Sequence, residues 1–460
     1  MTQPSALVVD LDGTLIRGDL LFESLLGHLK KAPWRLFIVV GWFWRGRAYA
    51  KTRLAESAEF AVATLPYNEA VLELIRSRKA SGQRVLLATG SAQGLAQRVA
   101  DHLGLFDGVI ATTASENLIG DVKRVAIEKR LRGESYTYIG NHRNDRVLWR
   151  AAAEAITVNP RATANEDMQI LVEEDSRRVP WWAALRPRHW LKNALLILPL
   201  LLAHRYADPS ALSKVTLGII AFSLLASSAY LVNDLLDLEV DRQHSLKRYR
   251  AVAAGVLGVP QALLLAGVCV ALGFGIGFVL PDSFVGWLTL YLLTTLAYSL
   301  FAKRLLMVDV IVLTGLYVVR LLAGGAAAGV AVSFWLLLFS MFFFLSLALL
   351  KRFVEVRNGS TQGRAYDRGD EFVLGQLGVT SATGAVLVLG LYVNSDAVRT
   401  LYESPNVIWL LCPLLTFWLG RLWLLGNRGE LDEDPVLFAT VDVSTWLVLL
   451  AAAVLLLVAR

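Results

Sequence analysis

The chain has 460 residues, of which 55% are hydrophobic and only 18% are charged, and its formal net charge is +6. This composition excludes an ordinary soluble protein, and the length exceeds what one compact domain usually holds. The basic residues gather in particular loops, as membrane topology requires, which argues against a nucleic-acid partner. We therefore expect a soluble unit followed by a membrane unit.

The first residues of the chain and its two cysteines indicate the cellular compartment of each unit. The first residues are polar and lead into a strand pattern, without the basic and apolar regions of a secretory signal. Cys269 and Cys412 lie in apolar runs, without the spacing of a zinc site or a disulfide framework. We expect the first unit to be cytoplasmic and the second to cross the inner (cytoplasmic) membrane several times.

The first unit, residues 1–160, begins with a pattern typical of α/β proteins. An apolar run at 6–9 leads into Asp10-Leu11-Asp12-Gly13-Thr14, as in a buried parallel strand that ends in a polar turn. Helical patterns separate most of the further strand candidates, which lie at 84–88, 108–111, 136–139 and 155–158. This predicts a doubly wound, Rossmann-like sheet with a site at the carboxyl ends of its strands. Residues of about 16–80 are predicted to form a helical cap.

These residues resemble the haloacid dehalogenase superfamily, most of whose members are phosphatases. The resemblance rests on DLDGT at 10–14, on Thr89 and Lys123, and on the stretch 140–145, which ends in Asp145. It implies that Asp10 is a nucleophile, that Asp12 is an acid and base, and that Thr89 and Lys123 bind the phosphoryl group. It also implies a magnesium site formed by Asp10, Asp145 and the Asp12 carbonyl. The family usually has an acid where this chain has Asn141.

One run inside the predicted cap has two interpretations. Residues 37–44 are apolar and are flanked by Trp34, Arg35, Arg45 and Arg47. The run is too short to span a bilayer. It fits a helix in the membrane interface, with Trp and Arg at headgroup level, and it fits a cap helix packed on the sheet equally well.

The second unit, residues 181–460, follows a polar linker at 161–180. About nine apolar segments are predicted in it, near 190–204, 212–236, 257–280, 283–301, 306–328, 333–351, 377–394, 406–425 and 438–459. A span needs about 20 residues, so the shorter segments are tilted, kinked or inexactly bounded. The expected fold is an all-α polytopic bundle.

The distribution of basic residues predicts the orientation of these segments. Loops on the side of the first unit contain Arg242, Lys247, Arg248, Arg250, Lys303, Arg304, Lys351, Arg352, Arg357, Arg364, Arg368, Arg421 and Arg428. The opposite side contains only Arg205, Lys214, Arg399 and Arg460. The positive-inside rule therefore places the first unit in the cytoplasm and, for nine spans, the C-terminus on the opposite side.

An acidic motif follows the second apolar segment. On a helix, Asp234, Asp237 and Asp241 lie on one face, where their oxygens suit a magnesium ion that also binds substrate phosphates. With Asn233 they complete the pattern NDxxDxxxD, which resembles the first signature of the UbiA prenyltransferase superfamily. Charge at membrane depth usually marks function, although a solvated helix face is the plainer alternative.

The chain also contains RPRHWLKN at 186–193, Tyr298, Lys303, Asp309, Lys351, Arg352 and Glu355. Together these residues resemble the branch of this superfamily that transfers phosphoribose to a polyprenyl phosphate. The resemblance implies phosphoribosyl pyrophosphate as donor, a polyprenyl phosphate of the decaprenyl type as acceptor, and Mg²⁺ as cofactor. The candidate substrate-binding residues are Lys192, Asn193, Asn233, Lys247, Arg248, Tyr298, Lys303, Lys351 and Arg352. Each basic residue among them is equally well explained as a determinant of topology. Arg320, within an apolar segment, fits a phosphate ligand or an acidic partner.

Three functions remain open at this stage. The first is a bifunctional enzyme whose first unit removes the 5-phosphate from the lipid product of the second. The second is an aromatic prenyltransferase that uses a prenyl diphosphate, with a regulatory or unrelated phosphatase. The third is a lipid-binding or transport module without activity. The oligomeric state is also open, a homo-oligomer included.

Overall fold

The computed structural model describes residues 4–31, 33–57, 61–159, 168–171, 179–359, 364–395, 398, 402–431 and 434–459. Most of the predicted linker, at 161–167 and 172–178, lies outside these residues, as do Arg399 and Arg460. The chain divides into two compact units. Unit 1 contains Met1–Ala184 and Leu231–Leu265, and unit 2 contains Leu185–Tyr230 and Ala266–Arg460.

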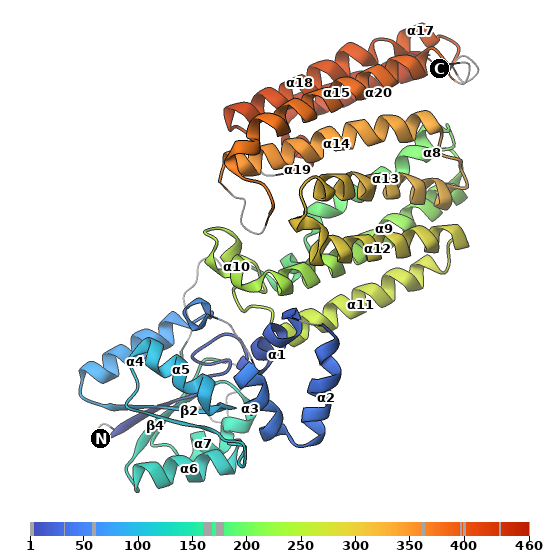
Figure 1. Ribbon diagram of the computed structural model, residues 1–460. Helices are drawn as coiled ribbons and strands as arrows, with labels where there is room; N and C mark the ends of the chain where they lie inside the picture. The colour runs from blue at the N-terminus through green and yellow to red at the C-terminus, as the bar shows by residue number, and fades with distance from the viewer. Residues whose placement is uncertain are drawn as a thin grey trace. The chain divides into compact units, whose positions relative to one another are not determined.

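A six-stranded parallel sheet forms the centre of unit 1, which confirms the predicted α/β architecture (Figure 1). Its strands are β1 (Ala6–Val9), β2 (Arg84–Ala92), β3 (Gly108–Thr112), β4 (Tyr136–Gly140), β5 (Glu154–Thr157) and β6 (Gln169–Ile170). Their order is β3-β2-β1-β4-β5-β6, so β1 lies in the middle and pairs with both β2 and β4. The polar turns after β1, β2 and β4 therefore meet at one edge.

Helices cover both faces of this sheet. Successive strand residues point to opposite sides, so Leu7 and Val9 enter one core while Ala6 and Val8 enter another. The first core also contains residues of α4 (Glu69–Ala80) and α5 (Gln93–Leu103), and the second contains residues of α6 (Asp121–Leu131) and α7 (Arg146–Ala151). Helix α4 therefore belongs to the layers on the sheet, although it lies within the predicted cap range.

The cap consists of three helices inserted between β1 and β2. They are α1 (Leu20–Lys31), α2 (Leu36–Trp44) and α3 (Arg47–Ser57). Unit 1 also contains the acidic motif and the segment after it, with α10 (Leu238–Gln243) and a short 3₁₀ turn at Lys247–Tyr249.

Seven helices in the described part of the chain are long and apolar enough to cross a membrane. They include α9 (Pro209–Leu236), α11 (Val259–Gly277), α12 (Asp282–Leu300), α13 (Val308–Ala328), α14 (Phe334–Arg357), α15 (Glu371–Val393) and α18 (Leu411–Arg428). Helices α19 (Pro435–Val441) and α20 (Val443–Ala459) meet at an angle of 82° and make an eighth if they form one span. Length and composition thus support seven or eight spans, against the predicted count of about nine.

The difference arises at the first predicted segment, 190–204. A 3₁₀ helix at Pro187–Ile197 is followed by the short helix α8 (Leu198–Leu202), so this segment is not one long α-helix. Within unit 2, α12 to α15, α18 and α20 then run side by side (Figure 1). Their core contains Leu350, Leu422 and Trp423, and a second core contains Leu196, Phe222 and Phe284.

Candidate functional site

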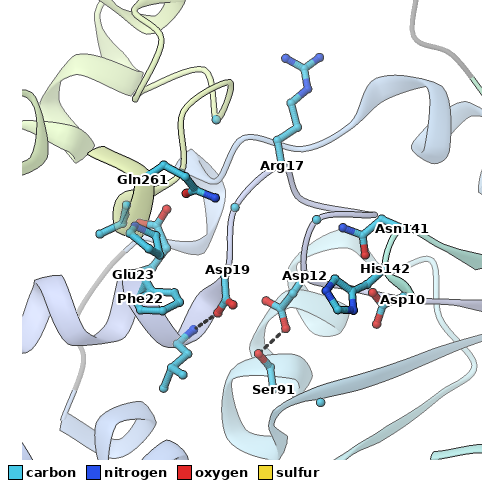
Figure 2. A pocket seen from close by; sticks show the side chains of 18 of the residues that line it. Asp10, Asp12, Arg17, Asp19, Phe22, Glu23, Ser91, Asn141, His142 and Gln261 are labelled. Carbon is cyan, nitrogen blue, oxygen red and sulfur yellow. Dashed lines mark hydrogen bonds between the residues drawn. The ribbon is translucent and has the colours of Figure 1, made fainter. Parts of the chain in front are cut away.

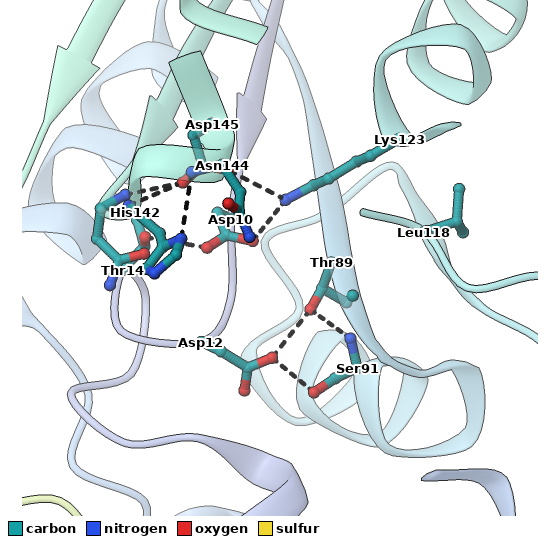
Figure 3. Close-up of polar contacts among 12 residues, drawn as sticks. Asp10, Asp12, Thr14, Thr89, Ser91, Leu118, Lys123, His142, Asn144 and Asp145 are labelled. Atoms are coloured by element: carbon teal, nitrogen blue, oxygen red, sulfur yellow. Dashed lines mark hydrogen bonds and ion pairs between the residues drawn. The ribbon is translucent and has the colours of Figure 1, made fainter. Parts of the chain in front are cut away.

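The carboxylate of Asp10 lies at the centre of a polar cluster after β1 (Figure 3). Lys123 donates hydrogen bonds from Nζ to Asp10 Oδ1 at 2.6 Å and to the Tyr138 hydroxyl at 2.8 Å. Thr14 donates to the other oxygen of Asp10 at 3.2 Å. Since Asp10 and Lys123 are both buried, this is an ion pair of low solvent access.

Asp145, from the turn after β4, completes the cluster. Tyr138 donates its hydroxyl to Asp145 Oδ1 at 3.0 Å, and the backbone amides of Asn141 and His142 donate to Oδ2 at 3.2 and 3.0 Å. Lys123 Nζ lies 4.0 Å from the same carboxylate. The structure therefore brings together the predicted residues Asp10, Lys123 and Asp145.

Asp12 is bound on the other side of the β1 turn. Its Oδ2 accepts hydrogen bonds from Ser91 Oγ at 2.6 Å and Thr89 Oγ1 at 3.2 Å, and its Oδ1 accepts from the amide of Leu20 at 2.8 Å (Figure 3). Ser91 was not predicted. The sequence indicates Ser91 only as a second hydroxyl side chain two positions after Thr89.

Burial dominates the electrostatics of this cluster. It raises the pKa of Asp10 to about 6 against the opposing effect of Lys123, and the charge of Asp145 raises that pKa further. Burial and the charge of Asp19 also raise the pKa of Asp12 to about 6. Three carboxylates, those of Asp10, Asp12 and Asp145, thus face two lysines, Lys123 and Lys51, and negative charge is in excess.

This donor set fits a magnesium ion. Mg²⁺ is commonly held by one or two carboxylates together with substrate phosphate oxygens, and Asp10 and Asp145 supply two carboxylates. No group of three or more His, Cys, Asp or Glu residues able to hold a metal is found in the described ranges. Asn141 stands at the position where an acid would supply a third carboxylate. Its side chain lies against Gly13 (φ +73°), since a Cβ added to Gly13 would be 2.0 Å from Asn141 Nδ2.

A cavity of about 540 Å³ opens in front of these residues (Figure 2). One side contains Asp10, Asp12 and Lys123. The opposite wall comes from the segment after the acidic motif, and we call it the 252–261 wall; its lining residues are Val252, Gly255, Val256, Leu257, Gly258, Val259, Pro260 and Gln261. The wall and the cluster both belong to unit 1.

Two contacts fix the 252–261 wall. Arg242 donates to both carboxylate oxygens of Glu23 in the cap, at 2.6 and 3.2 Å, and to the carbonyl of Ala253 at 3.2 Å. Gly255 (φ +74°) lies so close to Arg17 that an added Cβ would be 2.7 Å from the Cβ of Arg17. Only glycine suits position 255, since its positive φ disfavours other residues and the nearby Arg17 leaves no room for a side chain.

The acidic motif spans a break between two helices. Helix α9 ends at Leu236, Asp237 is the N-terminal cap of α10, and Asp241 lies inside α10. The chain nevertheless keeps helical hydrogen bonds, from the amide of Asp237 to Asn233 and from that of Asp241 to Asp237. Asp234 and Asp241 are each 3% exposed.

Arg250 joins the two buried acids of the motif. Its Nη1 lies 2.6 Å from Asp241 Oδ2 and 3.3 Å from Asp234 Oδ1. The three aspartates do not form a metal-binding group as they stand in the described chain. The donors are suitable, because Asp234 and Asp241 already converge on one positive charge. Of the neighbouring basic candidates, Lys247 is half-buried and Arg248 is exposed.

In unit 2, Arg352 is buried in an ion-pair network. It donates to Asp309 at 2.5 Å and to the hydroxyl of Tyr298 at 2.8 Å, and it also pairs closely with Glu355. Arg364 donates to the same Tyr298 hydroxyl at 2.8 Å. The predicted residues Tyr298 and Arg352 are thus in contact, and the bonds of Arg352 are made within the protein. Lys303 is buried as well.

Two other predicted lysines meet at an acid that sequence reasoning missed. Lys192 forms a close ion pair with Asp434, and Lys351 Nζ lies 3.8 Å from the same carboxylate. Asp434 also caps α19 through the amides of Val436 and Leu437. In the sequence, Asp434 directly precedes Pro435, a pattern that is typical of a helix N-terminus. This pattern predicts a capping role but does not identify Lys192 or Lys351 as its ion-pair partners.

Arg320 lies in a cage of polar and aromatic groups. It donates to Asn193 Oδ1 at 2.9 Å, to the carbonyl of Leu316 at 2.6 Å and to the Tyr291 hydroxyl at 3.1 Å. Its guanidinium also stacks over the rings of Tyr291 and Tyr317. The contacts found for it in the described chain include no carboxylate, which favours the anion-binding interpretation over an acidic partner.

Two protein families match separate stretches of the chain. The profile of the UbiA prenyltransferase family matches residues 194–448, and that of the haloacid dehalogenase-like hydrolases matches residues 7–150. A protein of Sinorhizobium fredii, uncharacterized protein y4nM, is 36% identical over 96% of this chain and 88% of its own length. Decaprenyl-phosphate phosphoribosyltransferase of Mycolicibacterium smegmatis is 34% identical over 56% of this chain and 85% of its own length.

A UbiA homologue from Archaeoglobus fulgidus, bound to GPP and Mg²⁺, covers 60% of this chain and 98% of its own, with 16% identity and a TM-score of 0.47.

We predict that Asn141→Asp strengthens magnesium binding in unit 1. A third carboxylate beside Asp10 and Asp145 should lower the magnesium concentration for half-maximal hydrolysis of a small phosphate ester about threefold or more, since charge count tunes the affinity of such sites. The intact protein in detergent is assayed over a magnesium series. Gln97→Glu adds the same charge on the exposed face of α5, at a residue that does not line the cavity, and should change little. Equal magnesium requirements in Asn141→Asp and the parent would contradict the assignment.

Proposed function

Because the chain belongs to the UbiA prenyltransferase family and carries a haloacid dehalogenase-like hydrolase domain, we propose that it performs two consecutive reactions on one lipid. It transfers 5-phosphoribose from phosphoribosyl pyrophosphate to a polyprenyl phosphate, and it then removes the 5-phosphate from the product. The main support for coupling is the 252–261 wall, since one short segment after the acidic motif also lines the hydrolase cavity.

In the transfer, an oxygen of the lipid phosphate attacks the anomeric carbon of the donor. The bond from that carbon to the pyrophosphate oxygen breaks, and pyrophosphate leaves with the bonding electrons. Asp234, Asp237 and Asp241 would hold magnesium, which supplies positive charge to the leaving group. Arg250, now held by two of these acids, would then be released to bind a phosphate.

Groups in unit 2 are assigned to the remaining phosphates. Lys192 and Lys351 share the one carboxylate of Asp434, so they have positive charge in excess. Arg320 lies in the middle of α13 and donates a hydrogen bond to Asn193. We assign the two lysines to the donor and the Arg320–Asn193 pair to the acceptor phosphate. Arg352 has a positioning role, since it binds Tyr298 and two acids.

In the hydrolysis, an oxygen of Asp10 attacks the phosphorus of the 5-phosphate and forms an aspartyl phosphate. The ribose oxygen leaves and takes a proton from Asp12. Asp12 then accepts a proton from the water that attacks the aspartyl phosphate, which releases inorganic phosphate and regenerates Asp10. The raised pKa of Asp12 suits both proton transfers. Lys123 stays close enough to bind the phosphoryl oxygens.

The transferase assignment predicts that Asp237→Ala abolishes transfer. Membranes containing the variant, supplied with radiolabelled phosphoribosyl pyrophosphate and decaprenyl phosphate, should form less than about 1% of the parent's lipid product, because the magnesium and its charge are lost. Glu239→Ala, in the same stretch but outside the motif, is the control and should stay active. Full turnover by Asp237→Ala, or by the parent in excess chelator, would refute the assignment. Product formed only from a prenyl diphosphate and a hydroxybenzoate would establish the aromatic prenyltransferase instead.

The coupling predicts different lipid products from the intact chain and from Asp10→Asn. The variant lacks the nucleophile and should accumulate the lipid-linked 5-phosphoribose, while the parent accumulates the ribose form with no 5-phosphate. Mass spectrometry separates the two products by one phosphate group. Asp121→Asn, an exposed aspartate on α6, should behave like the parent. Identical products from Asp10→Asn and the parent would remove the coupling and leave the transferase intact.

We also propose that the segment 187–202 crosses the membrane, which gives nine spans and a C-terminus opposite the first unit. Its 11 residues of 3₁₀ helix and 5 residues of α-helix reach about 30 Å if collinear, at about 2.0 and 1.5 Å per residue, which matches the hydrocarbon core. A periplasmic alkaline phosphatase fused after Arg460 should be active, and one fused after Gly429 inactive. Activity only at Gly429 would overturn the proposal, because either the segment 187–202 does not cross or the whole orientation is reversed. Matching results at both sites would change the number of spans after Gly429.

A further inference from the structure

The cap of unit 1 exposes an apolar helix. In α2, Val39 is the only residue buried, while Phe37 is 80% and Trp44 is 87% exposed. Trp34, just before the helix, is 71% exposed. The patch, which we call the α2 patch, contains Trp34, Leu36, Phe37, Ile38, Val40, Phe43 and Trp44. Soluble domains rarely expose so many large apolar side chains together, and such a surface marks a protein or membrane contact.

The chemistry around the patch identifies its partner. Aromatic residues lie at both ends, Trp34 before the helix and Trp44 as its last residue, which is the distribution of residues that anchor in the membrane interface. Arg35, Arg45 and Arg47 flank the patch, and Arg45 and Arg47 are exposed. An apolar surface edged by arginines complements a bilayer with anionic headgroups. We propose that the α2 patch inserts into the interface of the membrane that the rest of the chain spans.

The dimensions of α2 define how it inserts. Nine residues make a helix of about 14 Å, which is less than half the hydrocarbon thickness. The helix is apolar around most of its circumference, so it lies in the plane of the interface with Val39 directed toward the cap. Of the two interpretations left open by the sequence, this exposure argues against a cap helix packed on the sheet, because Val39 is the only buried residue of α2.

Membrane contact by the cap gives unit 1 a second attachment besides its covalent link to the spans. Helices α1 and α3 flank α2, and α1 also carries Glu23, which lines the cavity. Interface insertion would therefore hold the cavity close to the headgroups. A phosphate ester attached to a lipid then reaches the cavity without leaving the bilayer. The insertion itself does not depend on which phosphate ester the cavity accepts.

Nitroxide quenching in proteoliposomes tests the proposal with the full chain. Cys269 and Cys412 are replaced by Ala, and Phe37→Cys is labelled with an environment-sensitive fluorophore. The vesicles contain three parts phosphatidylcholine to one part phosphatidylglycerol. Lipids with a nitroxide near the headgroup should quench the label at least about threefold more than a label at Val125→Cys, which is exposed on α6 of the same unit. Thermal melting of each labelled protein verifies that it is folded.

The charge contribution is tested in the same system. Arg45→Gln combined with Arg47→Gln should reduce the quenching at position 37, and raising the salt concentration should do the same for the parent. Quenching at position 37 no greater than at position 125 would overturn the proposal. A label at position 37 that is shielded from both nitroxide lipids and aqueous iodide would also overturn it, because a second copy of the chain or another protein would then cover the patch.

Discussion

Pairing of buried carboxylates with basic side chains is the constraint on which both candidate sites depend. A carboxylate removed from water is strongly destabilising unless a positive charge and hydrogen bonds compensate it. Lys123 compensates Asp10 in unit 1, and Arg250 compensates two acids of the motif. Arg352 and Lys192 do the same in unit 2. Negative charge is in excess in unit 1, where the neighbouring acids and burial raise the pKa of Asp10, so that site favours a cation before it can accept a phosphate.

Local patterns were sufficient to predict the sheet and the position of the acids. The apolar run before Asp10 and the later strand candidates predicted a parallel sheet, because buried strands and their polar ends are encoded in short stretches, but they did not predict the order of the strands. The acidic motif was correctly expected at the end of the second apolar segment. The break at Asp237 was not predicted, although Asp234 and Asp241 remain close enough to share Arg250, nine residues after Asp241.

Features that depend on tertiary contacts could not be predicted. Asp434 meets Lys192 across 242 positions of sequence, and no local pattern encodes that distance. The 3₁₀ geometry of 187–197 was also missed, because hydropathy does not distinguish a 3₁₀ helix from an α-helix. Arg352 shows a related problem. A basic residue beside an apolar segment has the same sequence signature whether it binds a substrate or, as here, three groups of the protein itself.

The 252–261 wall limits how the chain can be divided. A cut within residues 161–180 separates the sheet and cap from one side of their own cavity, although the hydrolase motifs all stay on the first fragment. It also leaves Glu23, a buried carboxylate, without Arg242. Breaking a buried pair of this kind destabilises a protein by about 3–5 kcal/mol. A fragment that ends within residues 161–180 is therefore expected to be a less stable domain with an open, altered cavity.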